Sequence, residues 1–394
     1  MIAPEKIIYL DNNATTALDP AVLEEMLPFL GSYYGNPSGG YRFGKQVREA
    51  VDLARERVAA LLDCLPGEII FTSGGTESNN AALHSALRFE PKGKHIVTTT
   101  VEHSAILRPC EQFAARGAEV TFVGVASDGS LDLDELERAI RPETALVSVM
   151  WANNETGVVF PIDRIAEMVR AKRVLFHTDA IQAAGKIPIQ LSEMPVNFCS
   201  FSAHKLHGPK GVGALYVDRR SRFLPSLFGG GQEDGRRSGT ENVSGIIGFG
   251  KAAELALAKM DEEQKRVRGL RDRFENAILR AIPESFVNGG PLQRLPNTSS
   301  LSFAGIESDA ALMLLDRQQI CCSAGSACRT GSLESSHVMR AMGLSEKRLH
   351  GSLRFSFSRF NLDSEIDRVV EILPREIARL RALSAPGTLV SAGR

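Results

Sequence analysis

Short apolar runs alternate with amphipathic stretches along the first two-thirds of the chain. Several of these runs are continuous and rich in β-branched residues, which is typical of strands buried on both faces of a mostly parallel sheet. The stretches between them, such as ESNNAALHSALRF and SAILRPCEQFAARG, have helical spacing. The predicted strands are EIIFTS, HIVTTT, EVTFVG, ALVSVMWA, VLFHTDA, NFCSFSA and GVGALYV. This alternation predicts an α/β domain with helices on both sides of its sheet.

The pattern changes after Gly250. A long, charged, amphipathic stretch runs to Ile282 and predicts one long helix, or two joined helices, that leaves the sheet. The strands TSSLSFAG and LRFSFS and the helices DAALMLLDRQ and DSEIDRVVEILPREIARLRAL then predict a small α+β region with its own core. In a chain of 394 residues we expect two domains. The large one covers residues 14–257, and the small one covers residues 1–13 and 258–394.

The composition is that of an ordinary globular protein, with 43% hydrophobic and 24% charged residues. The formal net charge is -1, so no overall field favours nucleic acid or an anionic membrane as a partner. The N-terminal residues MIAPEKIIYLDNN lack the apolar core of a secretory signal, and no run approaches the roughly 20 apolar residues of a membrane span. We therefore expect a cytoplasmic protein that binds neither nucleic acid nor membrane.

The chain has six cysteines and no CxxC pair, so neither a disulfide framework nor a structural metal site is expected. In a reducing compartment, most cysteines are small buried hydrophobic residues. Cys321 and Cys322 fit that description, because they end an apolar stretch. Cys328 does not, since it lies in a loop of about residues 321–335 that is rich in Ser, Ala and Gly. The neighbouring Arg329 favours the thiolate, so the sequence predicts a reactive nucleophile at Cys328.

Residues with reactive or ligand-binding side chains recur at the carboxyl ends of the predicted strands, where ligands gather in open α/β sheets. In EIIFTSGGTESNN a strand ends, glycines turn the chain, and Gly75 and Thr76 open a helix. Backbone N–H groups at such a helix start can hold a phosphate. The alternative is a plain strand-to-helix turn, in which glycines are common.

A carboxylate at the end of an apolar strand is costly unless it is paired, and VLFHTDAIQA places Asp179 there. A pyridinium nitrogen would be a suitable partner, because a fixed carboxylate keeps it protonated. The alternative is that Asp179 is the N-cap of the next helix. Gln182 follows on the same face of a helical turn.

Lys205 stands between a strand and a glycine-rich loop, in NFCSFSAHKLHGPKGVG. Small, aromatic and imidazole groups flank it, which suits a lysine that forms a Schiff base. Ser202 and His204 are placed to bind the phosphate of a cofactor whose aldehyde Lys205 holds. The competing Lys210 is expected on an exposed turn between Pro209 and Gly211.

Three more polar residues follow or lie within strands. His103 is either a core histidine satisfied by the backbone, or a ring that stacks on a cofactor and moves protons. Asn154, in MWANNETG, could bond a ring hydroxyl of the cofactor. Arg354, in LRFSFS, needs an anion, which is either a substrate carboxylate or a salt-bridge partner inside the small domain.

Together these motifs resemble the class V aminotransferase family, and within it the NifS/IscS-type cysteine desulfurases. The resemblance runs from YLDNNATT to LRFSFSRFN, and its most specific parts are GGTESNN, EHSAIL, WANNETG, HTDAIQA, FSAHKLHGPKGVG, GRRSGTEN and SAGSAC. The sequences of these motifs are most similar to those of the NifS branch, which serves nitrogenase cluster assembly. The resemblance implies the α/β fold of fold-type I pyridoxal-phosphate enzymes. One departure is Tyr41, which stands where the family usually has a histidine.

The resemblance also implies roles for individual residues. Lys205 would bond pyridoxal 5'-phosphate, Asp179 would pair with the pyridine nitrogen, and His103 would stack on the ring. The ring-hydroxyl side would be contacted by Asn154 and Gln182. The phosphate would be held by Gly75, Thr76, Ser202 and His204, and by Thr240 of a second subunit in a homodimer. Arg354, with Asn154, would bind the substrate carboxylate, and Cys328 would take the sulfur as a persulfide.

The implied reaction converts L-cysteine to L-alanine and supplies sulfur for iron–sulfur cluster assembly, with a link to nitrogen fixation. The implied acceptor is a NifU-like or IscU-like scaffold, and Cys328 is a candidate contact for a transient iron–sulfur cluster. Alternatives are a general housekeeping desulfurase, a selenocysteine lyase, a plain aminotransferase and a non-enzymatic sulfur carrier. The last would need no Lys205 site, and a plain aminotransferase would leave Cys328 unexplained.

Overall fold

A seven-stranded sheet forms the larger of two bodies in the computed structural model, which describes residues 7–89, 93–290, 292–324 and 336–384. Its strands, in sequence order, are β2 (Ile69–Thr72), β3 (His95–Thr99), β4 (Glu119–Val123), β5 (Thr144–Ser148), β6 (Leu175–Asp179), β7 (Phe198–Ser202) and β8 (Gly213–Val217). The spatial order is β2-β8-β7-β6-β5-β3-β4, and only β8 runs antiparallel to its neighbours. The seven predicted strands and the mostly parallel sheet are confirmed.

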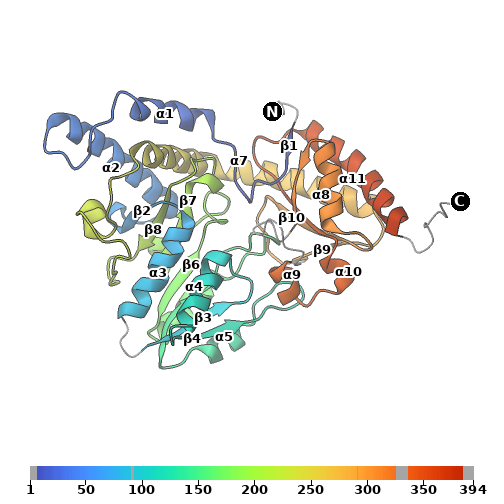
Figure 1. Cartoon of the computed structure of the whole chain (residues 1–394), viewed down its shortest axis with the longest axis horizontal. Helices are drawn as coiled ribbons and strands as arrows, with labels where there is room; N and C mark the ends of the chain where they lie inside the picture. Colours follow the sequence, from blue (N-terminus) through green and yellow to red (C-terminus); the bar gives the residue numbers. More distant parts are fainter. Residues whose placement is uncertain (1–6, 90–92, 291, 325–335, 385–394) are drawn as a thin grey trace, which may run out of the picture.

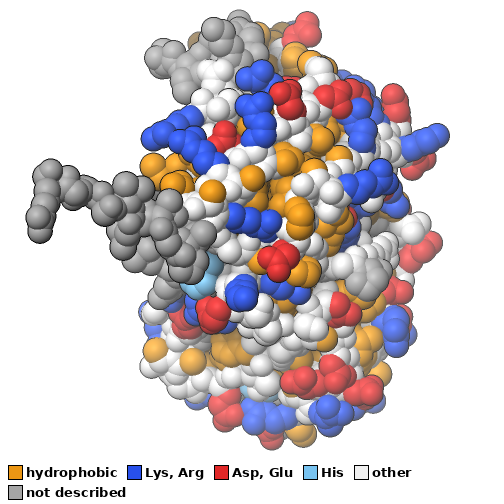
Figure 2. Space-filling model, turned by 90° about the vertical axis from the view of Figure 1, so that its right-hand side faces the viewer, with side chains coloured by type: hydrophobic (Ala, Val, Ile, Leu, Met, Phe, Trp, Pro, Cys, Tyr) orange, Lys and Arg blue, Asp and Glu red, His pale blue; other side chains and the backbone are white. Residues whose placement is uncertain are grey.

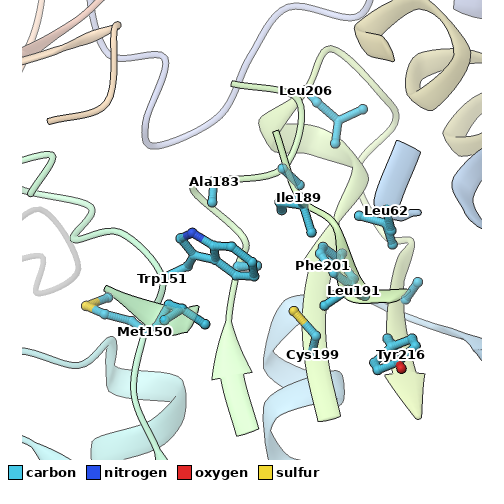
Figure 3. Close-up of a cluster of buried hydrophobic side chains, with 14 of the residues drawn as sticks. Leu62, Met150, Trp151, Ala183, Ile189, Leu191, Cys199, Phe201, Leu206 and Tyr216 are labelled. Carbon is cyan, nitrogen blue, oxygen red and sulfur yellow. The ribbon is translucent and has the colours of Figure 1, made fainter. Parts of the chain in front are cut away.

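Helices cover both faces of this sheet (Figure 1). Successive residues of one strand face opposite ways, so Ile70 packs against α3 (Gly75–Phe89) and α4 (Ser104–Ala114), whereas Phe71 belongs to the larger core on the other face. Figure 3 shows part of that larger core, with Trp151 and Phe201 among its labelled side chains. The remaining helices of this body are α1 (Pro20–Leu30), α2 (Arg42–Leu62), α5 (Leu133–Ala139) and α6 (Ile162–Ala171), with short 3-10 turns η2 (Pro66–Glu68), η3 (Leu191–Glu193), η4 (Ala203–Lys205) and η5 (Gln232–Gly235).

One helix of 39 residues, α7 (Val243–Ala281), connects the two bodies. Its first half, which includes Ile246 and Met260, packs in the larger core. Its second half, from Val267 to Ile278, packs in a separate core. Figure 1 shows α7 passing from one body into the other. The sequence left open one helix or two joined ones, and the structure has one.

The smaller body is an α+β unit around a four-stranded antiparallel sheet of order β12-β13-β10-β9. Its elements are β9 (Ser285–Val287), β10 (Thr298–Phe303), α8 (Ser308–Arg317), β11 (Ile320–Cys321), β12 (Ser323–Ala324), β13 (Ser352–Ser356) and α11 (Asp363–Ser384). Between β12 and β13 lie α9 (His337–Ala341) and α10 (Glu346–Leu349), whose buried residues Val338, Met339 and Leu349 pack in the larger core. Near the N-terminus, β1 (Ile8–Tyr9) pairs with β11, and Ile8 and Leu10 belong to this smaller core. Ile8 and Leu10 therefore belong to the smaller body although they precede the larger one in sequence.

The surface carries both signs of charge. On the face shown in Figure 2, acidic and basic side chains are interspersed with apolar ones. Across the described residues, no helix is both long and apolar enough to cross a membrane.

Candidate active site

The predicted site lies at the carboxyl ends of two neighbouring parallel strands. Asp179 is the last residue of β6 and is paired in register with Ser200 of β7. Strand β7 ends at Ser202, and η4 follows it directly, so Lys205 lies just beyond the same edge of the sheet. Because adjacent parallel strands end at one edge, residues 26 positions apart in sequence come together.

Asp179 is buried and fully engaged. Its Oδ2 accepts a hydrogen bond of 2.7 Å from the Asn79 side chain, and its Oδ1 accepts one of 3.0 Å from the Ile181 backbone N–H. The expected N-cap of a following helix is wrong, because residues 181–186 form a turn, and the second bond stabilises that turn. Burial raises the pKa of Asp179, and the nearby His103 acts in the opposite direction. A group that brings positive charge to this carboxylate would therefore be stabilised there.

His103 caps α4 and lies within electrostatic reach of the same carboxylate. Its Nδ1 accepts a 3.1 Å hydrogen bond from the Ala105 N–H, as expected for a ring satisfied by the backbone. The neutral ring therefore carries its proton on Nε2. Burial lowers the pKa of His103, Asp179 raises it, and Lys205 lowers it further. The backbone bond orients the ring and leaves Nε2 for chemistry.

The Lys205 amine lies against the N-terminal segment. Its Nζ donates to the carbonyl oxygens of Asn13, at 2.5 Å, and Ala14, at 2.6 Å. Gln182 Nε2 donates to the same Asn13 carbonyl, at 2.9 Å. The structure thus brings Lys205 and Gln182 together through Asn13. Sequence reasoning assigned Asn13 no role, although it lies within the YLDNNATT motif.

The side chain of Asn13 extends this network into the smaller body. Its Nδ2 donates to the Asn154 carbonyl, at 3.1 Å, and to Thr298 Oγ1, at 2.9 Å. Its Oδ1 accepts from Asn297 Nδ2, at 2.9 Å. In its bonds with Asn13 and Arg354, Asn154 accepts through its backbone carbonyl oxygen and not through its side chain. Asn13 is only 1% exposed, so it acts as a buried connection between the bodies.

Arg354 faces this connection from β13. Its guanidinium forms a salt bridge of 2.6 Å with Asp11 and donates to the Asn154 carbonyl at 3.0 Å. The salt-bridge alternative from the sequence is therefore realised. The buried Nε of Arg354, however, has no hydrogen-bond partner in the described structure. An unsatisfied buried donor is costly, so an incoming carboxylate has a favourable place to bind.

The start of α3 has the features of an anion cradle. Its first N–H groups, at Gly75 and Thr76, have no acceptor within their own helix. Gly74 has a φ of +152°, which favours glycine, and a Cβ added to it would meet no atom within 4 Å. A Cβ on Gly75 would instead lie 2.1 Å from Ile181 Cδ1. The chain thus leaves open space beside a helix start that is packed against the turn after Asp179.

His204 approaches from η4 with its ring held in place. Its Nδ1 lies 3.1 Å from Thr15 Oγ1. Burial lowers the pKa of His204 to about 4, with Lys205 and Lys210 contributing in the same direction. A neutral His204 would contact a phosphate through hydrogen bonding and not through charge. Lys210 is exposed, as predicted.

Comparison with known proteins decides the family. Residues 8–369 match the model of the aminotransferase class-V family. The chain belongs to the class V aminotransferase family. A protein named cysteine desulfurase from Nostoc sp. is 53% identical over 96% of this chain and 94% of its own length. The cysteine desulfurase NifS of Azotobacter vinelandii is 48% identical with the same two coverages.

A solved structure described as a NifS-like protein matches with a TM-score of 0.89 and 38% identity, over 95% of this chain and 100% of its own. The resemblance stated from the motifs and the α/β fold of the family are both confirmed. Class V aminotransferases use pyridoxal phosphate, so the site of this member can be tested for fit to that group. It offers an amine at Lys205, a buried carboxylate at Asp179, an oriented ring at His103 and open space beside α3. These residues fit the aldehyde, the pyridine nitrogen, the ring face and the phosphate.

Two predicted residues are not joined to this cluster. Thr240 is exposed and lies with Ser73 on a separate hollow of about 190 Å³. The segment leading to it is held by a bidentate bond from Arg237 to Glu77, at 2.8 and 3.1 Å. Cys328 lies outside the described residues. In this class V member, both assignments stay predictions.

Two buried carboxylates near the site were not assigned by sequence reasoning. Glu155 accepts a hydrogen bond from Ser336 Oγ, and burial raises its pKa to about 7. Glu102 accepts from Thr99 Oγ1, at 2.8 Å, and its pKa is raised to about 8 by burial. The motif WANNETG contains Glu155, but the sequence predicted a role only for Asn154. Among the described residues, no group of three or more His, Cys, Asp and Glu side chains could hold a metal ion.

Proposed function

We propose that this chain is a pyridoxal-phosphate-dependent cysteine desulfurase. It converts L-cysteine to L-alanine and passes the sulfur to Cys328 as a persulfide. The observation that carries the proposal is that Lys205 and the buried Asp179 lie at the ends of two adjacent parallel strands. The names of relatives that are about 50% identical over nearly the whole chain support the choice of substrate.

Each side chain has a task that follows from its surroundings. Lys205 would hold the aldehyde of the cofactor, and its free amine would take the α-proton of cysteine. Asp179 holds the pyridine nitrogen in its protonated form, and when bound the cofactor supplies a sink for the electrons of the α-carbon. His103 would lie against the ring and would move a proton at Nε2. Gln182 and Asn154 bind the ring-hydroxyl side.

Binding of the anionic groups divides between the two bodies. The start of α3, with Gly75, Thr76, Ser202 and His204, holds the phosphate. Arg354, with Asn154, would bind the substrate carboxylate, and the buried Nε of Arg354 has no hydrogen-bond partner among the described residues. The guanidinium must share its charge between that carboxylate and Asp11.

The sulfur step balances without an added oxidant. The Cys328 thiolate attacks the sulfur of the bound cysteine, a sulfur–sulfur bond forms, and the bond between Cβ and sulfur breaks. The electron pair of the broken bond goes to the carbon fragment, which takes up the proton that the Cys328 thiol gave up and leaves as alanine. The support for Cys328 is its loop of small residues and the neighbouring Arg329, which favours the thiolate. A thiol reductant then releases sulfide from the persulfide.

We also propose a homodimer in which Thr240 reaches the phosphate in the partner subunit. The exposed side of α1 supports it, because Leu23, Leu27 and Leu30 follow one helical face and are 44%, 55% and 62% exposed. Tyr41, where the family usually has a histidine, is also exposed, at 55%. An exposed apolar row of this kind is typical of a covered surface.

The two cores support a division into two domains. We propose the boundaries expected from the sequence, residues 14–257 for the large domain and residues 1–13 with 258–394 for the small one. The boundary falls within α7, and Met260, Val338 and Met339, which lie beyond it, still pack in the larger core. A cytoplasmic location stays a prediction from the sequence.

The wider role that we propose is sulfur supply for iron–sulfur cluster assembly, with a NifU-like or IscU-like scaffold as acceptor. The NifS name of one relative supports a link to nitrogen fixation. A housekeeping desulfurase would share the same chemistry and differ in its acceptor. A selenocysteine lyase would turn over selenocysteine without dependence on Cys328, so comparing the two substrates separates them.

The direct test is to add L-cysteine and a reductant to the purified protein with pyridoxal phosphate, and to measure alanine and sulfide together. We expect equal amounts of the two products. Cys328→Ala should lose sulfide release while it keeps the cofactor, and Cys64→Ala serves as a matched control. Unchanged sulfide release by Cys328→Ala would show that Cys328 does not take the sulfur.

A further inference from the structure

Helix α3 reaches the carboxylate of Asp179 one turn after its start. Gly75 and Thr76 begin the helix, and Asn79 follows on the same face as Gly75, because positions four apart are neighbours on a helix surface. Asn79 is 0% exposed. Its Nδ2 donates a hydrogen bond of 2.7 Å to Asp179 Oδ2, from a residue 100 positions away in the sequence. Asn79 therefore joins the helix of the proposed phosphate cradle to the strand end that carries Asp179.

The other oxygen of Asp179 depends on the same helix. Asp179 Oδ1 accepts a hydrogen bond of 3.0 Å from the backbone N–H of Ile181. Ile181 packs closely on Gly75, since a Cβ added to Gly75 would overlap Ile181 Cδ1. Any side chain at position 75 would therefore displace Ile181 and its bond to the carboxylate. Both oxygens of Asp179 are thus held by groups that belong to α3 or pack against it, and this fixes the plane of the carboxylate.

The position of Asn79 is set by its neighbour in the helix, Ser78. The buried Ser78 Oγ lies 2.8 Å from Thr72 Oγ1 on β2 and 3.0 Å from the Ala214 carbonyl oxygen on β8. These contacts bind the first turns of α3 to two strands of the larger sheet. The helix cannot slide along the sheet without breaking them, so the amide of Asn79 is presented to Asp179 by a fixed support.

The far end of the Asn79 amide shows that this residue does not serve packing alone. Its Oδ1 is buried and has no hydrogen-bond partner among the described residues. An unsatisfied buried acceptor lowers stability, and an apolar side chain of similar shape would avoid that cost. Turning the amide over would place Oδ1 against the Asp179 carboxylate, so the N–H group must face Asp179. The bond to Asp179 is therefore what offsets the burial of this amide.

The other groups that favour an ionised Asp179 can change their charge. Burial raises the pKa of Asp179, and His103, then the Asn79 bond, and later Lys205 lower it. Burial lowers the pKa of His103, so its ring is neutral at neutral pH. In the proposed function the Lys205 amine bonds the aldehyde. An amide N–H, in contrast, donates at every pH and takes no proton from the carboxylate.

We propose that Asn79 is a positioning residue for Asp179, whose amide fixes the plane of the carboxylate and favours the ionised form that keeps a pyridine nitrogen protonated. This inference rests on the proposed function, which pairs Asp179 with the cofactor. Without the amide donor the carboxylate becomes more basic, so a proton shared with the nitrogen moves toward Asp179. Because α3 also begins with the proposed phosphate cradle, one helix would position the groups that bind both ends of the cofactor.

The test uses pyridoxal phosphate labelled with ¹⁵N in its ring, bound to the protein and observed by solid-state NMR at neutral pH. The chemical shift of this nitrogen reports its protonation and requires no turnover. Asn79→Leu keeps the approximate shape but removes the donor. We expect its nitrogen shift to move toward that of neutral pyridine, and the dissociation constant of the cofactor to rise by about 10-fold. Asn80→Leu, which removes a bond to the Thr76 carbonyl within α3, should change neither value.

The nitrogen shift of Asn79→Leu decides the inference. A shift equal to that of the unaltered protein would overturn it, even if the cofactor binds more weakly, because Asn79 would then support packing alone. An equal change of the shift in Asn80→Leu would overturn it too. If Asn79→Leu does not fold, Asn79→Ala replaces it under the same criteria. If the unaltered protein takes up no pyridoxal phosphate, or holds it with an unprotonated ring nitrogen, the proposed function fails instead.

Discussion

The two sides of the candidate site are built in different ways. On the larger body, Asp179 and Lys205 are placed by buried parallel strands that end side by side. On the smaller body, Arg354 lies within an antiparallel strand and reaches outward to Asp11 and the Asn154 carbonyl. The first arrangement follows from sheet topology alone. The second depends on how the two bodies meet.

The N-terminal segment joins these two sides. Asn13 gives its carbonyl to Lys205 and Gln182, and gives its side chain to Asn154 and Thr298. One buried residue thus bonds groups on both sides of the candidate site. The comparison teaches that changes on the larger body should abolish chemistry, whereas changes on the smaller body should weaken substrate binding.

The largest effect is expected on the cofactor side. Asp179→Asn keeps the shape but removes the charge, so kcat should fall by about 100-fold or more. Steady-state kinetics with L-cysteine measures it. Asn79→Ala removes only one hydrogen bond to Asp179 Oδ2 and should cost far less. Near-normal kcat in Asp179→Asn would refute the assigned role of that carboxylate.

A smaller and different effect is expected across the junction. Arg354→Gln should raise the KM for L-cysteine by about 10- to 100-fold, with less change in kcat, because it removes a charged contact with the substrate. Arg348→Gln is the matched control, since that arginine bonds Asn288 within the smaller body. Equal KM values for the two variants would place the substrate carboxylate elsewhere.

The joining segment should show an intermediate pattern. Asn13→Ala removes side-chain bonds between the bodies but leaves the carbonyl, so it should lower Tm by about 2–6 °C and reduce kcat several-fold. Asn12→Ala is the control, because Asn12 Nδ2 bonds Tyr9 and Ser356 within the smaller body. If both variants lower Tm alike, only Asn13→Ala should also slow turnover. A loss of kcat in Asn12→Ala of the same size would contradict the connection.

The smallest effect concerns pH. In the folded protein the pKa of Glu155 is raised from 4.5 to about 7, so the folded state holds a proton that the unfolded state releases. The stability contributed by this proton is complete below pH 4.5 and is lost as pH rises through about 7. Glu155→Gln should therefore flatten the dependence of Tm on pH in this window. Glu111→Gln, an exposed control, should leave the dependence as it is.

Strand positions and the strand-end chemistry were predictable from the sequence, for a physical reason. Continuous apolar runs specify buried parallel strands, and the polar residue after each run must lie at the shared edge. Asp179 and Lys205 could be found in this way. Asn13 could not, because its partners Lys205, Gln182 and Asn154 come from distant segments of the chain, and no local pattern encodes such contacts. For Arg354 the sequence left two partners open, a substrate carboxylate or a salt bridge within the small domain. The structure shows a salt bridge between Arg354 and Asp11.

The central claim is that Lys205 holds pyridoxal phosphate. The most direct measurement is the visible absorbance of the protein after it is mixed with the cofactor and freed of excess, compared between the unaltered chain and Lys205→Ala. The account predicts a visible band in the unaltered protein, which L-cysteine changes, and no such band in Lys205→Ala. A band of equal strength in Lys205→Ala, or its loss in Lys210→Ala instead, would contradict the claim.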